Sequence, residues 1–166
     1  MSMIGNLRLV SDEQLNELFA DPDQVEDFLY ESGEPSPDEE EDVDKAWQGL
    51  HFLLTGSAWN GEPPLNFLVS GGREIGDVDV GYGPARGFTP AEVAEISQAL
   101  GQITSDDLRA RFDGKRLMDA QIYPEIWDRD SAEDDTLGYL VANFESMKGF
   151  LERAAGKSSG LLVYIN

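Results

Sequence analysis

The sequence contains no cysteine and a single histidine among its 166 residues. The absence of cysteine excludes disulfide bonds, thiolate metal sites and a cysteine nucleophile. Because transition-metal sites combine several histidine or cysteine ligands, one histidine gives such a site little support. Any nucleophile–base pair or catalytic triad built on histidine has to use His51.

Long hydrophobic runs are also missing. No run approaches the roughly 18 apolar residues that a membrane-spanning helix needs. Residues 1–10 lack the long apolar stretch and the small-residue cleavage site of a signal peptide. Hydrophobic residues still make up 40% of the chain, which suits the core of one domain. We therefore expect a cytoplasmic, single-domain protein (residues 1–166) that does not bind membranes.

Basic residues are few. The chain has 12 of them and 33 acidic residues, which gives a net charge of −21. Residues 11–46 alone hold 15 acidic residues and one basic residue, Lys45, a net charge of −14. Such a protein repels phosphate backbones, so we expect no nucleic-acid partner. Two interpretations remain: the charge keeps the surface solvated, or it meets a basic protein partner.

Apolar spacing and capping residues predict helices in six segments. These are residues 11–20, 21–33, 44–55, 89–101, 104–120 with a break or bend at Gly114, and 136–155. Two of the helix starts carry capping boxes, formed by Ser11 with Gln14 and by Thr89 with Glu92.

Short strands are predicted at residues 6–10, within 73–88 and at 161–165. The last is an unbroken apolar run, which predicts a central strand covered on both faces. Strands and helices do not alternate regularly, which favours an α+β fold. We expect about six helices on a small mixed sheet that includes the C-terminal strand. Residues 33–43 are predicted to form an acidic, mobile loop.

Four stretches together resemble one bacterial family. They are "MSMIGN" at the start, "DKAWQGLHFLLTG" at 44–56, "GPARGFTPAEV" at 83–93, and "LRARFD" followed at a distance by "IYPEIW". The chain resembles the YfbM-like family, also known as DUF1877, over its whole length. The resemblance implies a small α+β domain, but no activity and no functional residues. The acidic insert around residues 39–42 looks particular to this sequence.

His51 lies in the apolar helix predicted over residues 44–55. Thr55 is one turn away on the same face of that helix, and Asp44 lies seven residues earlier, again on that face. An Asp–His–Thr arrangement is conceivable, although it has no oxyanion hole of its own. The alternative is a partly buried histidine that bonds a backbone carbonyl or a carboxylate.

The stretch "GYGPARG" at 81–87 is similar to a phosphate-binding loop, but its glycines have the wrong spacing. Pro84 also removes a backbone donor where donors would be needed. Arg86 could still bind an anion. The alternative is a glycine-rich turn between a strand and a helix.

Two acidic stretches contain carboxylates that are candidate metal ligands. "DVDVG" at 77–81 starts like a calcium loop, but its twelfth position is Phe88 instead of a bidentate glutamate. "DRDSAEDD" at 128–135 is a weak candidate for Ca²⁺ or Mg²⁺. Its candidate ligands are Asp128, Asp130 and Asp134, with Glu133 and Asp135 beside them. Solvated loop carboxylates and helix caps are the alternative.

Two tryptophans, Trp59 and Trp127, fall in predicted loops. Large aromatic side chains in loops are often interface anchors or pocket walls. They equally often close the core.

The sequence supports two functional hypotheses. The leading one is a non-enzymatic protein-interaction module whose acidic face binds a basic partner, as a small acidic protein that neutralises a toxin would. The rival is an enzyme or small-molecule binder with a pocket around His51. Its candidate catalytic residues are His51 and Thr55, and its candidate ligand-binding residues are Trp47, Arg86 and Tyr123. We predict no cofactor. The rival hypothesis requires an accessible His51 imidazole.

Overall fold

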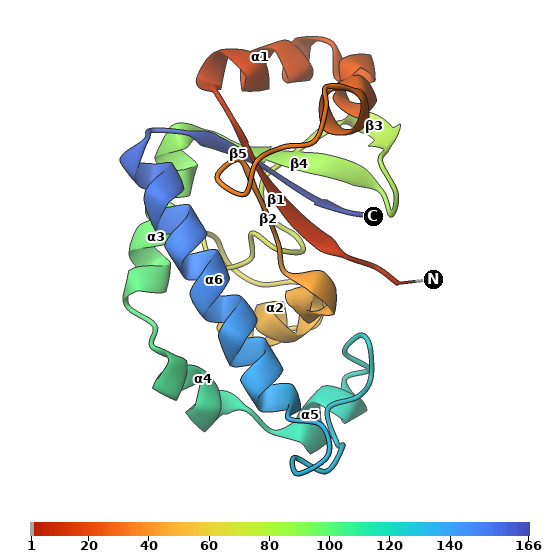
Figure 1. The fold of residues 1–166 in the computed structure, drawn as a ribbon, viewed down its shortest axis with the longest axis vertical. Coiled ribbons are helices and arrows are strands. Elements are labelled where there is room, and N and C mark those ends of the chain that lie inside the picture. The colour runs from red at the N-terminus through yellow and green to blue at the C-terminus, as the bar shows by residue number, and fades with distance from the viewer. Residues whose placement is uncertain (1) are drawn as a thin grey trace.

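The first and last strands of the described chain lie side by side. The computed structural model describes residues 2–166. Strand β1 (Gly5–Val10) pairs antiparallel with strand β5 (Gly160–Ile165), from Gly5 opposite Ile165 to Val10 opposite Gly160. This pairing joins segments from the two ends of the chain and forms the middle of the fold (Figure 1).

Five strands form one sheet in the order β2-β1-β5-β4-β3. The remaining strands are β2 (Glu40–Asp42), β3 (Arg73–Asp79) and β4 (Pro84–Phe88). Strand β5 lies in the middle of this order, as its unbroken apolar run predicted. Every pairing between these strands is antiparallel, whereas the sequence analysis expected a mixed sheet. Strands β3 and β4 form a hairpin, and β5 runs opposite to both of its neighbours.

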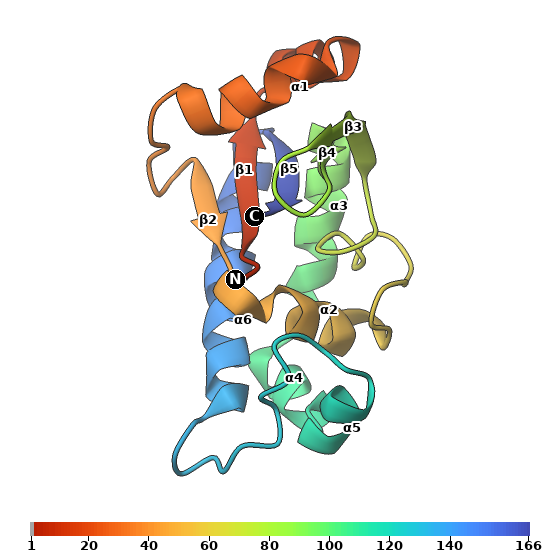
Figure 2. The same ribbon diagram turned by 90° about the vertical axis from the view of Figure 1, so that its right-hand side faces the viewer.

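Helical segments from the middle and the C-terminal part of the chain cover one face of the sheet (Figure 1). They are η3 (Asp44–Ala46) leading into α2 (Trp47–Thr55), α3 (Pro90–Gly101) and α6 (Thr136–Gly156). Leu7, Leu161 and Val163 of the sheet belong to the core that these helices close. Helices α4 (Ser105–Arg111) and α5 (Gly114–Asp119) lie at the end of the molecule opposite α1 (Figure 2).

Shorter helical segments cover the opposite face. They are α1 (Asp12–Ala20), η1 (Pro22–Gln24) and η2 (Asp27–Glu31). Because successive strand residues point to opposite faces, Val10 and Leu162 enter this second core instead of the first. The result is an α+β domain with one helical layer on each side of the sheet.

Several local predictions are confirmed. Both capping boxes are present, with Ser11 and Thr89 each accepting a backbone N–H bond three residues on. Gly56 ends α2 in the left-handed conformation at φ 79°. The helix predicted over 104–120 is interrupted at Phe112 and Asp113 and resumes as α5.

Two segments differ from the predictions. Residues 21–33 form the turns η1 and η2 instead of one continuous α-helix. The loop predicted over 33–43 contains strand β2, where Glu41 lies opposite Leu7 of β1. An acidic stretch has low strand propensity by itself, and only the distant edge of β1 supplies its pairing partner. Within residues 2–166, no helix combines the length and apolar character needed to cross a membrane.

Candidate functional site

His51 lies on the buried helix α2 and its side chain is 0% exposed. After Gly56 the chain reverses, and this places the carbonyl oxygen of Asn60 2.6 Å from His51 Nε2. The other ring nitrogen, Nδ1, has no hydrogen-bond partner among residues 2–166. Burial lowers the pKa of His51 and the nearby Arg86 charge lowers it further, while the bond to Asn60 raises it. The ring is therefore neutral at pH 7, with Nε2–H donating to Asn60.

The other parts of the predicted Asp–His–Thr arrangement point elsewhere. The Thr55 hydroxyl donates to the backbone oxygen of His51 at 2.8 Å, and its oxygen accepts from Ser57 N. The Asp44 carboxylate accepts from the Tyr139 hydroxyl at 2.7 Å. Thr55 thus closes the C-terminal end of α2 and Asp44 joins η3 to α6, so the arrangement lacks the relay that a triad requires. The buried, backbone-bonded alternative for His51 matches this geometry.

Arg86 holds a loop in place instead of presenting an anion clamp. From β4, its Nη1 donates to the carbonyl oxygens of Phe67 (2.9 Å) and Gly71, and its Nη2 donates to that of Leu68 (2.8 Å). Burial lowers the pKa of Arg86 to about 10, and Glu74 opposes that shift. The guanidinium remains charged at neutral pH and fixes the path of residues 67–71 against the sheet.

Three aromatic side chains from distant segments stack at the N-terminal end of α2. Trp47 stacks on Tyr123 with ring centroids 5.7 Å apart, and Trp59 tilts against Trp47 at 6.3 Å. The Trp47 indole donates to Met3 O, and the Tyr123 hydroxyl accepts from Met3 N. Trp47 is buried, whereas Trp59 is 60% exposed. The structure thus brings Trp47 and Tyr123 together, with their polar atoms already occupied.

A hollow of about 210 Å³ lies beside this stack, at the end of the β4–β5 pair. Its wall includes Trp59, Glu74, Tyr82, Pro84, Arg86 and Ile165. The β3–β4 turn positions Tyr82, because Asp79 Oδ1 accepts from Gly81 N and Gly83 N while Tyr82 N donates to Ile165 O. These hydrogen bonds hold the pKa of Asp79 below its usual range, so its charge persists.

Three large aromatic side chains are exposed, and all three surround the end of β5. They are Tyr30 (47% exposed), Trp59 (60%) and Tyr82 (44%). Tyr30 packs edge-on against Tyr164 of β5, and its hydroxyl donates to Val80 O. We call these three residues the aromatic rim. The rim therefore lies at the end of the sheet where β5 reaches Ile165.

Three of the five carboxylates of "DRDSAEDD" make local contacts instead of gathering around a metal position, and the Asp128 side chain is exposed. Asp134 pairs with Arg129 at 2.7 Å, and Asp130 accepts from Ala132 N at 2.9 Å. Asp135 caps α6 through Gly138 N. Within residues 2–166, no group of three His, Cys, Asp or Glu side chains is arranged to hold a metal ion.

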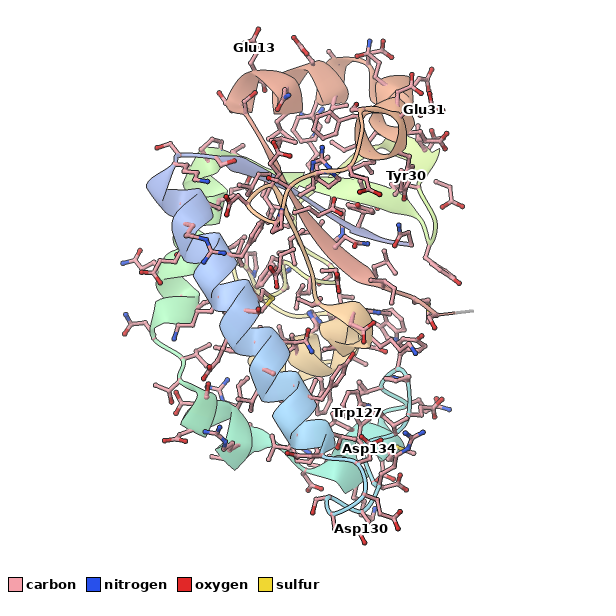
Figure 3. The ribbon with its side chains drawn as sticks, in the orientation of Figure 1. Glu13, Tyr30, Glu31, Trp127, Asp130 and Asp134 are labelled. Carbon is pink, nitrogen blue, oxygen red and sulfur yellow. The ribbon has the colours of Figure 1, made fainter. Side chains whose placement is uncertain are left out.

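We call residues 11–46 the acidic segment. It supplies the helical segments α1, η1 and η2 over the second face of the sheet, then the edge strand β2, and ends in η3 beside α2. Glu40, Glu41 and Asp44 are partly exposed, and the other carboxylates of the segment are exposed. Of the four ion pairs within residues 2–166, only Arg8–Glu40 (3.6 Å) involves this segment. Figure 3 shows Glu13 and Glu31 at the α1 end of the molecule, far from Asp130 and Asp134. The acidic segment therefore carries mostly unpaired negative charge.

Known proteins are similar to this chain in sequence and in fold. The family model described as "Domain of unknown function (DUF1877)" matches residues 1–164. The chain belongs to the DUF1877 family. It is 28% identical to Protein YfbM of Escherichia coli (strain K12) over 174 aligned residues that cover 99% of each protein. A crystal structure titled as a protein of unknown function, YfbM from Escherichia coli, matches with a TM-score of 0.76 and 26% identity, covering 98% of this chain and 99% of that one.

The family resemblance inferred from the sequence is therefore confirmed, as is the α+β class. Sequence reasoning did not single out Glu74, Tyr82 or Tyr30 of this DUF1877 chain as site residues. An aromatic between two glycines, as in "GYG", was the available signal for Tyr82, because such a turn exposes its middle residue. Of the two loop tryptophans, Trp59 is exposed and Trp127 is 2% exposed, with its indole bonded to Ile122 O.

Proposed function

We propose that this DUF1877 protein is a non-enzymatic interaction module that binds a basic protein partner through its acidic segment. The observation that carries the proposal is the concentration of 15 acidic residues and one basic residue in one segment, where most of the carboxylates are exposed and only one ion pair forms. Unpaired surface charge of one sign is destabilising to the protein itself, and a partner of opposite charge relieves that repulsion. It also accelerates diffusional encounter with such a partner. A basic toxin is one kind of partner that would fit.

The aromatic rim adds anchors to this charged surface. Tyrosine and tryptophan dominate binding energy at protein interfaces, because they bury large areas and lose little side-chain entropy. Tyr30 belongs to the acidic segment, and the charges of Glu26 and Glu40 act on its hydroxyl. An exposed aromatic ring thus lies among acidic groups, a combination that suits an interface with a basic protein.

The surroundings of His51 favour a binding role over catalysis. The imidazole is buried, neutral and bonded to a backbone carbonyl, so it has no path to exchange a proton with a bound ligand. Thr55 and Arg86 also donate their hydrogen bonds to backbone oxygens. This geometry weakens the rival pocket hypothesis, because its general base lies inside the core.

The test compares two charge variants of equal size. One replaces five carboxylates of the acidic segment with glutamine: Glu13, Glu17, Glu26, Glu31 and Glu34. The matched control replaces five exposed carboxylates elsewhere with their amides: Glu62, Glu95, Asp128, Glu133 and Glu152. Each variant removes five negative charges from the net of −21, so the two differ only in where the charge is lost.

Wild type and both variants are immobilised and exposed to a lysate of the source organism, and captured proteins are identified and purified. We expect a basic protein that binds wild type and the control but is lost from the acidic-segment variant. Its affinity for wild type should fall by at least tenfold between about 0.05 M and 0.3 M NaCl, as screening of charge demands. Capture that is equal for all three proteins, or capture of no basic protein, would overturn the proposal.

A further inference from the structure

The hollow beside Trp59 has the chemistry of a cation-binding pocket. We propose that it accepts an arginine side chain of the basic partner, stacked on Trp59 and Tyr82 and paired with Glu74. This inference rests on the proposed function for the partner's basic character. The hollow itself is a separate structural feature, built mainly from the β3–β4 hairpin and the end of β5, with Trp59 and Val69 added by the loop after α2.

Trp59 and Tyr82 form an aromatic wall of the hollow that is both held in place and exposed to solvent. Trp59 is 60% exposed, yet its ring leans on the buried Trp47, which in turn stacks on Tyr123. A supported indole loses little freedom when a ligand stacks on its open face. Tyr82 is 44% exposed and is held by the hydrogen bond from its backbone N–H to Ile165 O. A guanidinium is planar and weakly hydrated, so it stacks on such rings better than an ammonium does.

The charges around the hollow favour a cation. Glu74 and Arg86 are opposite each other in the β3–β4 pairing, but they form none of the ion pairs within residues 2–166. The Arg86 guanidinium turns to three carbonyl oxygens of the 67–71 loop instead, so backbone dipoles offset part of its charge. Glu74 is left exposed in the wall, with Asp79 further along the same strand. Glu74 is therefore the carboxylate of the wall that a bound cation can pair with, since the Arg86 guanidinium is bonded to backbone carbonyl oxygens.

The volume and position of the hollow agree with a single side chain. About 210 Å³ is below the range of roughly 300–1,000 Å³ that drug-sized ligands occupy. Tyr164, which contributes to the wall, donates its hydroxyl to Glu40 of the acidic segment at 2.8 Å. This hydrogen bond ties the end of β5 beside the hollow to strand β2 of the acidic segment.

The experiment titrates ¹⁵N-labelled protein with three probes: octaarginine, octalysine and N-acetylglycine. The indole N–H signals report on the site, because Trp59 lies in the hollow while Trp127 is buried and serves as an internal control. The variants are Glu74→Gln and Tyr82→Ala. Glu95→Gln is the matched control, since Glu95 is an exposed carboxylate on α3 outside the hollow.

We expect octaarginine to shift the Trp59 indole signal and to leave that of Trp127 in place. Glu74→Gln should weaken octaarginine binding about fivefold and Tyr82→Ala about threefold, while Glu95→Gln changes it less than twofold. Octalysine should bind at least threefold more weakly with a smaller Trp59 shift, because an ammonium does not stack. N-acetylglycine should leave the Trp59 signal unmoved.

Failure of the two proposals gives different results. If octaarginine binding is lost in the five-residue acidic-segment variant but is the same for Glu74→Gln and Glu95→Gln, the arginine pocket is wrong and the proposed function stands. If Glu74→Gln weakens binding while the acidic-segment variant binds as wild type does, the pocket stands and the proposed function fails. A Trp59 shift with N-acetylglycine would assign the hollow to anions through Arg86 and overturn the inference.

Discussion

The exposed indole of Trp59 leans on the buried ring of Trp47, with centroids 6.3 Å apart and planes tilted by 51°. Trp47 is 2% exposed and Trp59 is 60% exposed, so the pair spans the boundary between core and solvent. Trp59 follows Trp47 by twelve positions in the sequence, and the chain reverses at Gly56 between them. The contact explains how a loop side chain can be both accessible and ordered.

Trp59 should be the tryptophan that a soluble quencher reaches first. We expect acrylamide to quench wild-type fluorescence in two fractions, and Trp59→Phe to remove the accessible fraction. Trp47 and Trp127 are buried and donate to Met3 O and Ile122 O, so they should resist quenching. Stern–Volmer plots of the two proteins make the comparison. An accessible fraction that persists in Trp59→Phe would place another tryptophan at the surface.

His51 should make the free energy of unfolding depend on pH in a range above that in which the carboxylates titrate. Burial lowers the pKa of His51 in the folded state below its usual 6.5, so the unfolded chain binds the extra proton first. Stability is therefore lost as pH falls below about 6.5, by at most about 1.4 kcal/mol per pH unit. His51→Gln keeps a donor for Asn60 O and should flatten this dependence. Urea unfolding between about pH 7.5 and 5.5 measures it, and equal slopes would contradict the assignment.

Arg86 should stabilise the fold by holding the 67–71 loop. Arg86→Met removes three hydrogen bonds and leaves buried carbonyl oxygens without donors, which should cost about 2–4 kcal/mol. The matched control is Arg109→Met, whose exposed pair with Asp106 is worth less than about 1 kcal/mol. Denaturant unfolding compares the two variants. A similar small loss in both would show that the loop does not depend on the guanidinium.

Gly49 should be required by packing despite its unfavourable helix propensity. A Cβ at Gly49 would lie 2.8 Å from Leu140 Cδ2 and 3.1 Å from the Trp127 ring, in the core between α2 and α6. Gly49→Ala should therefore destabilise the protein by about 1–3 kcal/mol through overpacking. At Gly101, where a Cβ meets nothing within 4 Å, Gly101→Ala should instead stabilise by up to about 1 kcal/mol. Changes of the same sign in both variants would contradict this account of α2.

Features that depend on near neighbours could be predicted from residue order. The capping boxes at Ser11 and Thr89 involve residues three positions apart, and Gly56 ends α2 through its own backbone freedom. The unbroken apolar run of β5 required cover on both faces, which placed it in the centre of the sheet. The charge of the acidic segment and the family resemblance were likewise readable from residue order.

The tertiary structure alone decided which distant residues meet and where their polar atoms point. Strand β2 forms because residues 40–42 pair with the edge of the distant strand β1. No pattern within those residues predicts such a pairing. Arg86 could have faced an anion, but the loop at 67–71 supplies carbonyl oxygens that hold it. The aromatic rim gathers residues 30, 59 and 82 around the end of β5, and only the folded sheet brings them together. Long-range packing thus moved the candidate site from the buried His51 to the exposed hollow beside Trp59.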